Sequence, residues 1–205
     1  MTITHANAQQ WATDYDEKTP QEILALVLDN FDNAAISFSG AEDVVLIDMA
    51  AKLGKPFRVF SLDTGRLHAE TYQFIEKVRN HYKVAIEICF PESAQVQEMV
   101  NAKGLFSFYV DDHKECCTVR KVAPLKKKLA TLDAWVTGQR KDQSPGTRLA
   151  VPVVQADAAF SGAGKQLIKF NPLSNWTSAQ VWDYIRSNEV PYNALHEKGF
   201  TSIGC

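Results

Sequence analysis

Two adjacent cysteines, Cys116 and Cys117, are the residues whose spacing points most directly to chemistry. Neighbouring Cα atoms lie about 3.8 Å apart, below the usual span of a disulfide, so an ordinary bridge between them would be strained. Side-by-side thiolates favour a soft metal site, iron–sulfur or zinc, over two thiols buried by chance. Lys121 shares the face of Cys117 if the helix is continuous, and its ammonium could then lie between thiolates and an anionic substrate. Ordinary solvation is the alternative for this lysine.

A run of hydroxyls, a glycine and carboxylates stands where a short apolar strand is expected to turn into a helix. Its residues are Ser37, Phe38, Ser39, Gly40, Ala41, Glu42 and Asp43. Free backbone N–H groups at a helix start can cradle an anion, and an ordinary glycine turn with a serine cap is the alternative. Carboxylates in the first turn would repel a bare phosphate, so we expect them to contact a ribose or adenine.

Two further loops follow expected strands. The first contains Leu62, Asp63, Thr64 and Gly65, and it is either a tight turn capped by its own side chains or part of a nucleotide site with Leu62 against an adenine ring. The second begins at Gly138, Gln139 and Arg140 and reaches Arg148. Two guanidiniums near a strand end suit phosphate or sulfate, and a pair of surface arginines is the alternative.

Alternating strands and helices are expected to position these loops. The patterns predict strands over 34–39, 57–62, 84–90 and 134–138, shorter strands at 151–155 and 167–170, and helices over 19–29, 42–53, 68–82, 92–103, 112–130 and 177–187. Thr19, Pro20 and Glu22 form a helix-start signature, and Pro124 predicts a kink or break. The prediction is a doubly wound α/β fold, with a mainly parallel sheet and helices on both faces. Ligands bind such sheets at the carboxyl ends of strands.

The composition is that of one ordinary globular domain. The 205 residues are 45% hydrophobic and 22% charged, and a net charge of -2 excludes an electrostatic DNA or RNA binder. The N-terminus lacks a secretory signal, and no apolar run approaches the roughly 18 residues of a membrane span. We therefore expect a cytoplasmic protein whose cysteines are thiols, metal ligands or redox groups rather than structural disulfides.

Two lesser features receive structural interpretations. Lys126, Lys127 and Lys128 are predicted to form a solvated helix face. Cys89 ends an apolar strand and is predicted to be a small core residue. Neither feature therefore enters the predicted site.

Taken in order, these motifs resemble those of the bacterial assimilatory adenylyl-sulfate reductases, relatives of the phosphoadenylyl-sulfate reductases. The similarity runs from about Ala34 to Cys205 and includes residues 39–43, 62–66, 115–121, 138–140, 143–144, Arg148, 171–173, Trp176, 191–193 and His196. The double cysteine is the discriminating element. Members of the family that carry it bind a 4Fe–4S cluster and generally use adenylyl sulfate, whereas relatives without it use the 3′-phosphorylated substrate.

The resemblance implies an enzyme of sulfate assimilation that reduces adenylyl sulfate to sulfite and AMP with thioredoxin as reductant. A cysteine thiolate would attack the sulfate sulfur, and thioredoxin would release sulfite from the resulting S-sulfocysteine. Lys121 and Arg148 would hold sulfate and phosphate oxygens, and His113 would help line the site. The loop over 37–43, Leu62 and Gly138 would hold the adenosine. The resemblance also suggests a homo-oligomer.

The end of the sequence departs from the family pattern. The family's cluster uses the adjacent pair and a later Cys-x-x-Cys, and its nucleophile lies in a tail bearing Glu-Cys-Gly. This sequence stops at Cys205, which matches the first cysteine of the later pair. We therefore expect Cys116, Cys117 and Cys205 as metal ligands and a nucleophile beyond residue 205. We expect a single reductase domain over 1–205, with a helical segment at 1–33, a nucleotide-binding α/β core at 34–173 and a helical segment at 174–205.

Two other functions stay open on these residues. An adenylating ATP pyrophosphatase would use a Ser-Gly-Gly-x-Asp loop that residues 39–43 resemble, with Ala41 and Glu42 as departures. Ala41 and a double cysteine with no role argue against that enzyme. A non-catalytic nucleotide or iron–sulfur sensor would bind its ligand without turnover.

Overall fold

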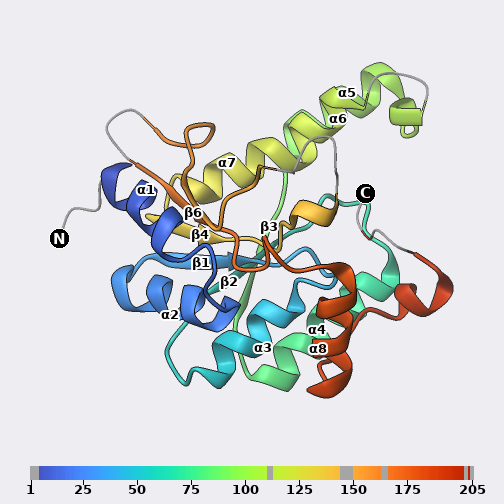
Figure 1. Cartoon of the computed structure of the whole chain (residues 1–205). Helices are drawn as coiled ribbons and strands as arrows, with labels where there is room; N and C mark the ends of the chain where they lie inside the picture. The colour runs from blue at the N-terminus through green and yellow to red at the C-terminus, as the bar shows by residue number, and fades with distance from the viewer. Residues whose placement is uncertain (1–4, 110–112, 144–149, 163–165, 201–202, 204–205) are drawn as a thin grey trace.

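The strands in the described part of the computed structural model form a six-stranded sheet (Figure 1). They are β1 (Ala34–Ser37), β2 (Val59–Leu62), β3 (Ile86–Cys89), β4 (Ala134–Val136), β5 (Val154–Ala156) and β6 (Ile168–Phe170), in the order β3-β2-β1-β4-β6-β5. β5 is antiparallel to β6, and the other neighbours are parallel, which confirms a mainly parallel sheet. The structure describes residues 5–109, 113–143, 150–162, 166–200 and 203.

Helices alternate with these strands along the chain. They are α1 (His5–Asp14), α2 (Pro20–Asn30), α3 (Val44–Lys52), α4 (Ala69–Tyr82), α5 (Ser93–Lys103), α6 (Lys114–Cys117), α7 (Ala123–Leu129) and α8 (Ser178–Ser187), with short turns η1 (Ser107–Tyr109), η2 (Thr118–Val122), η3 (Lys141–Gln143) and η4 (Ala194–Lys198). Thr19 and Thr177 close capping boxes at the starts of α2 and α8. Among the described residues no helix has both the length and the apolar character that crossing a membrane requires.

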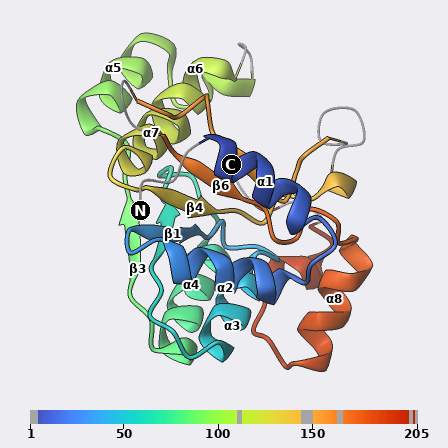
Figure 2. The ribbon, with the colours of Figure 1, turned by 60° about the vertical axis from the view of Figure 1, so that its left-hand side comes forward.

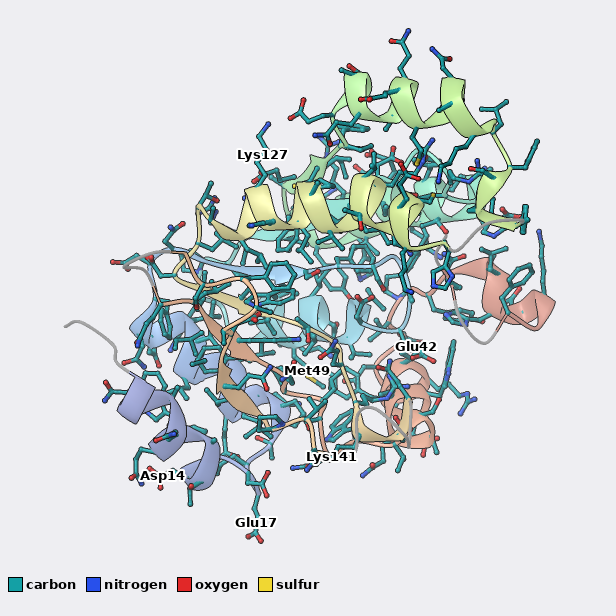
Figure 3. All side chains as sticks on the ribbon, turned by 90° about the horizontal axis from the view of Figure 1, so that it is seen from above. Asp14, Glu17, Glu42, Met49, Lys127 and Lys141 are labelled. Atoms are coloured by element: carbon teal, nitrogen blue, oxygen red, sulfur yellow. The ribbon has the colours of Figure 1, made fainter. Side chains whose placement is uncertain are left out.

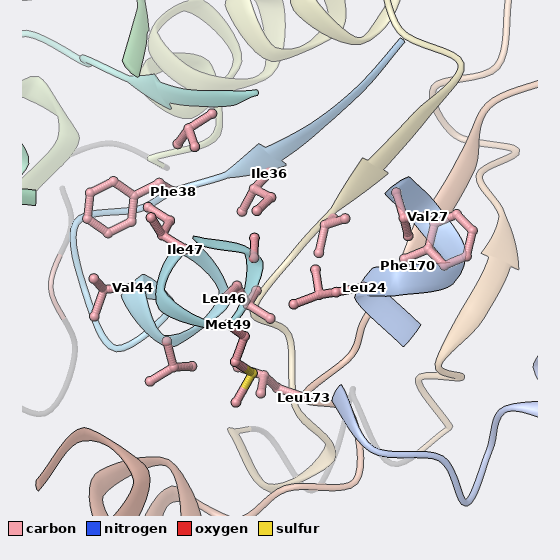
Figure 4. Close-up of a cluster of buried hydrophobic side chains, with 14 of the residues drawn as sticks. Leu24, Val27, Ile36, Phe38, Val44, Leu46, Ile47, Met49, Phe170 and Leu173 are labelled. Carbon is pink, nitrogen blue, oxygen red and sulfur yellow. The ribbon is translucent and has the colours of Figure 1, made fainter. Parts of the chain in front are cut away.

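Side chains alternate along the central strands between the two faces of the sheet. In β1 Ile36 belongs to the larger hydrophobic core and Ala35 to the smaller one, and in β4 Val136 and Trp135 divide in the same way. The larger core is filled by residues of α2, α3, α4 and α8. Figure 4 labels residues that α2 and α3 contribute to it. Helix α7 lies on the opposite face, with α5 and α6 on its side of the sheet (Figures 1 and 2). Helices therefore cover both faces, as predicted.

The strand order changes direction between β1 and β4. From β1 the chain proceeds outward through β2 to β3, and it then returns to place β4, β6 and β5 on the other side of β1. Such a switch point opens a crevice at the carboxyl ends of the two central strands, and open α/β sheets bind ligands there. The fold thus marks the ends of β1 and β4 as the place for a site.

The segment that carries the cysteine pair is helical over 114–129, as predicted, and a π-helical turn interrupts the α-helix just before Pro124. Helix α6 ends at Cys117 and is followed by a π-helical turn, η2, in which the Ala123 N–H donates to the Thr118 carbonyl. The hydroxyl of Thr118 also donates to the Lys114 carbonyl at 2.8 Å. Pro124 lies in the first turn of α7, where proline is tolerated, so the irregularity precedes it. π-helical turns of this kind are frequent at functional sites.

The three consecutive lysines of α7 do not form one solvated face. Lys126 and Lys127 are exposed, but Lys128 is only 7% exposed, and the prediction was wrong for this residue. Its Nζ donates to Oε2 of Glu87 on β3 at 2.5 Å, because α7 packs against this part of the sheet. The Lys128 ammonium is thus paired where the helix covers the strand.

Candidate functional site

Three loops meet at the carboxyl ends of β2, β1 and β4, which are neighbours in the sheet. The loops after β1 and β4 approach closely, because a Cβ atom placed on Gly138 would lie 2.6 Å from the Cβ of Asp43. Any side chain at position 138 would therefore push the two loops apart. This approach lies at the switch point of the sheet, and the glycine allows it.

The loop between β1 and α3 uses its own backbone N–H groups. Asp43 accepts hydrogen bonds from the N–H of Ser39 at 2.6 Å and from that of Ala41 at 3.2 Å. Gly40 lies between them with φ of +81°, a conformation that favours glycine. Burial raises the pKa of Asp43 to about 6, although the two hydrogen bonds favour its charged form. A nucleotide phosphate at this loop would have to compete with the Asp43 carboxylate for these N–H groups.

A buried ion pair joins the loops after β1 and β4. Arg140 is 4% exposed, and its Nη1 donates to Oε2 of Glu42 at 2.9 Å. Its Nε donates to Oδ1 of Asp142 at 3.0 Å, and Oδ2 of Asp142 accepts from the N–H of Ser178 at 2.5 Å. Figure 3 labels Glu42 on the side of the molecule away from Asp14 at the end of α1. Two carboxylates therefore engage the guanidinium of Arg140, a geometry suited to orienting Glu42 rather than to binding an anion directly.

The loop after β2 is a tight turn closed by its own aspartate. Oδ1 of Asp63 accepts from the N–H of Gly65 at 2.7 Å and from the hydroxyl of Tyr72 at 2.8 Å. Leu62, just before this turn, is half-buried and packs against the smaller core. The turn thus stands at the same end of the sheet as Gly138, where Leu62 keeps part of its apolar surface accessible.

The two adjacent cysteines are half-buried free thiols at the end of α6. They line a pocket of about 490 Å³, and the other residues around it are Arg66, His68, Phe108, Tyr109 and His113. Within the described ranges no group of three or more His, Cys, Asp or Glu side chains could hold a metal ion. Cys116 and Cys117 therefore provide two soft donors on one wall of this pocket.

Two arginines join the cysteine pocket to the loop after β2. Arg120 is 7% exposed, its Nη1 donates to the Thr64 carbonyl at 2.6 Å, and its buried Nε has no partner among the described residues. The guanidinium carbon of Arg66 lies 4.1 Å from the ring centroid of Phe108. Its Nη1 also donates to the Leu105 carbonyl at 3.1 Å. These contacts hold residues 105–109 and 114–122 against the end of β2.

The remaining predicted site residues differ in their exposure. Ser37 and Lys121 are half-buried, and Ser39 and His113 are exposed. Arg148 and Cys205 lie outside the described residues. Because η2 is π-helical, Cys117 and Lys121 are not related by a regular α-helical turn, and the role of Lys121 stays a prediction.

Cys89 lies at the carboxyl end of the edge strand β3. It is half-buried and packs against the smaller core, so the predicted core residue lies at the edge of that core. Burial is the main cause that raises the pKa of its thiol, and the nearby Glu87 carboxylate acts in the same direction. A raised pKa leaves little thiolate, so Cys89 is poorly suited to nucleophilic attack.

Arg120 and Asn193 belong to the motifs 115–121 and 191–193, but the sequence analysis assigns neither of them a role. Arg120 lies in the π-helical turn after the cysteine pair, and its Nη1 reaches the Thr64 carbonyl, 56 positions earlier in the chain. Asn193 is fully buried and donates to the carbonyl of Gly40, 153 positions earlier in the chain. No local pattern could predict this second contact, because it depends on how η4 packs against α4.

Comparisons with known proteins identify relatives of this chain. The chain matches the model of the phosphoadenosine phosphosulfate reductase domain over residues 33–205. The adenosine 5'-phosphosulfate reductase of Pseudomonas aeruginosa (strain LESB58) is 58% identical over 195 residues, covering 95% of this chain and 73% of that protein. The adenosine 5'-phosphosulfate reductase of Allochromatium vinosum is 43% identical over 187 residues, 90% of this chain and 71% of that protein. Both relatives are longer than this chain.

Solved structures show the same fold. A phosphoadenylyl-sulfate reductase from Candida auris, in a phosphate complex, has a TM-score of 0.82 at 28% identity, covering 100% of this chain and 96% of that one. An FMN adenylyltransferase from Candida glabrata in complex with ATP has a TM-score of 0.61 at 17% identity, covering 100% of this chain and 64% of that one, a likeness in fold alone. These matches confirm the predicted fold, and the match over residues 33–205 shows that the chain belongs to the phosphoadenosine phosphosulfate reductase family.

Proposed function

We propose that this chain carries the reductase domain of an enzyme that reduces adenylyl sulfate to sulfite and AMP in sulfate assimilation. The observation that carries the proposal is the pair Cys116 and Cys117 in one pocket with Arg66, which follows β2. The relatives named adenosine 5'-phosphosulfate reductase, at 58% and 43% identity, support this substrate. Free thiols at the three described cysteines are consistent with work in a reducing cytoplasm.

The adenosine is assigned to the loops at the switch point of the sheet. Leu62 offers an apolar surface for the adenine, and Gly138 lets the loop after β4 approach the loop after β1 closely. Ser37 and Ser39 supply hydroxyls, and Glu42 suits a ribose hydroxyl because Arg140 fixes its carboxylate. We therefore revise the predicted role of Arg140 from an anion ligand to a residue that orients Glu42.

The phosphate and sulfate groups are assigned to the side of the site near the cysteine pocket. Lys121 and Arg148 would hold their oxygens by charge-assisted hydrogen bonds, and His113 would line the site. Lys121 belongs to η2, directly after the cysteine pair, which supports this assignment. The carboxylates of Glu42 and Asp43 disfavour a phosphate or sulfate group at the loop after β1. The negative end of the substrate would therefore extend toward Lys121 and Arg148.

The pocket offers part of the donor set of a 4Fe–4S cluster. Such clusters are held by cysteine thiolates, and Cys116 and Cys117 supply two of them, with Cys205 proposed as a third. Arg66 and His68 line the same pocket, and the positive charge of the Arg66 guanidinium suits negatively charged thiolates. When bound, the cluster would supply an electrostatic centre beside the sulfate end of the substrate.

The bond-making step is assigned to a cysteine thiolate outside residues 1–205, in accordance with the greater length of the relatives. The thiolate would attack the sulfate sulfur, the bond from that sulfur to the bridging oxygen would break, and AMP would leave with that oxygen and its electron pair. A thiolate of reduced thioredoxin would then attack the cysteine sulfur of the S-sulfocysteine and displace sulfite. The second thioredoxin thiol would resolve the mixed disulfide, which leaves thioredoxin oxidised and the enzyme thiol restored.

Separate incubations of the full-length protein test this function. With adenylyl sulfate and reduced thioredoxin we expect sulfite and AMP in equal amounts, with one thioredoxin dithiol oxidised per sulfite. With ATP alone we expect no pyrophosphate. Pyrophosphate from ATP without sulfite in the first incubation would identify an adenylating enzyme. Nucleotide binding without either product would identify a sensor.

A further inference from the structure

Asn193 joins the loop after β1 to the segment that follows α8. Its side chain is 0% exposed, and Nδ2 donates to the Gly40 carbonyl at 2.9 Å and to Oγ1 of Thr71 at 3.2 Å. Its Oδ1 accepts from the N–H of Leu195 at 3.0 Å, which caps the start of η4. Both amide protons and the carbonyl of this side chain are therefore used, each by a different element.

The bond to Gly40 has a consequence on the opposite side of the same peptide group. The Gly40 carbonyl and the Ala41 N–H belong to one planar trans peptide, so they point in opposite directions. When Asn193 holds the carbonyl, it also directs the Ala41 N–H, which donates to Asp43 at 3.2 Å. A side chain far along the sequence thus fixes a donor at the nucleotide loop.

Packing at Gly40 prevents the peptide from moving to another arrangement. A Cβ atom on Gly40 would lie 2.6 Å from Cγ2 of Thr71, so the loop backbone rests directly on α4. The segment after Asn193 is tied to the same helix, because Nζ of Lys198 donates to Oε1 of Glu70 at 2.5 Å. The loop, α4 and η4 therefore form one connected unit.

We infer that Asn193 is a positioning residue, which sets the direction of the Ala41 N–H at the nucleotide site and couples the loop to the segment over 193–200. The part of this inference that concerns nucleotide affinity rests on the proposed function. The part that concerns the Ala41 N–H does not, because it can be measured in the free protein.

Asn193→Ala and Thr71→Val are the matched pair that tests the inference. Thr71→Val keeps the methyl group against Gly40 and removes the hydroxyl, so it lowers stability by leaving one Asn193 proton without an acceptor. It keeps the bond from Asn193 to Gly40. Asn193→Asp serves as a second variant should the alanine variant fold poorly, since it retains the cap on Leu195 but cannot donate to Gly40.

The measurements are amide hydrogen exchange at Ala41 by NMR and the affinity for AMP by calorimetry. In the Asn193 variants we expect Ala41 exchange to quicken and the dissociation constant for AMP to rise, each about tenfold, the effect of losing one well-placed hydrogen bond. Thr71→Val should change neither by more than about twofold. Unchanged Ala41 exchange in the Asn193 variants, or equal losses of affinity in Thr71→Val, would overturn the inference. If exchange responds as expected and the unaltered protein binds no AMP, the proposed function fails. The inference that Asn193 sets the direction of the Ala41 N–H then still holds.

Discussion

Replacing Gly138 with alanine perturbs the contact between the loops after β1 and β4. The added Cβ would lie 2.6 Å from Cβ and 3.4 Å from Cα of Asp43. Restoring ordinary contact at 3.4 Å requires the loops to separate by about 0.8 Å, and neither Asp43 atom is the end of a flexible side chain. Overpacking of this kind costs about 1–3 kcal/mol in the free energy of unfolding.

The functional loss should exceed the loss of stability. Moving Asp43 also disturbs the N–H groups of Ser39 and Ala41, which it engages. A displacement near 1 Å at a reacting site costs about a hundredfold in rate, so we expect kcat/KM of the Gly138→Ala enzyme to fall by about ten- to a hundredfold. The assays are urea denaturation and initial rates of sulfite release.

Gly162→Ala is the matched control for this substitution. Gly162 has no atom within 4 Å of an added Cβ and no positive φ, so alanine should be neutral within about 0.5 kcal/mol and leave kcat/KM unchanged. Normal stability and normal kcat/KM in Gly138→Ala would refute the close approach of the two loops. Equal effects of both substitutions would also refute it.

Three further predictions follow from the same site. Burial raises the pKa of Asp43 from 3.8 to about 6, so between these pH values the native state binds more protons than the unfolded chain. The free energy of unfolding should therefore fall as the pH rises from 3.8 to about 6. Asp43→Asn should flatten that part of the profile in urea titrations, and an unchanged slope would count against the buried carboxyl. Arg140→Ala should lower the free energy of unfolding by about 3 kcal/mol, because it leaves the Glu42 carboxylate without its buried partner. Adding Glu42→Gln to this variant should restore part of the lost stability. If the losses of the two single variants simply add in the double variant, the pairing is contradicted. Cys116→Ser or Cys117→Ser should abolish the visible absorption and bound iron of the full-length protein, and retention of both would exclude these ligands.

The sequence predicted the fold well because its signals were local. Capping boxes at Thr19 and Thr177, and apolar strands followed by glycine-containing turns, depend only on neighbouring residues. The order of these elements was enough to predict a mainly parallel sheet with loops at the ends of β1, β2 and β4. The cysteine pair was equally visible, because adjacency is itself the signal.

Features that depend on tertiary contacts could not be predicted in this way. The ion pair from Arg140 to Glu42 and the bond from Asn193 to Gly40 join residues 98 and 153 positions apart. Lys128 was expected in solvent, but α7 packs against β3 and places its ammonium at Glu87. Pro124 predicted an irregularity in this helix, but its π-helical form over 118–122 and the burial of Arg120 could not be predicted.

Competition between two substrates tests the central claim most directly. Sulfite release by the full-length protein should be measured with reduced thioredoxin, using adenylyl sulfate and its 3′-phosphorylated counterpart at equal concentrations. The account predicts a higher kcat/KM for adenylyl sulfate, together with AMP as the nucleotide product. Faster release from the 3′-phosphorylated compound, or no sulfite from either, would contradict it.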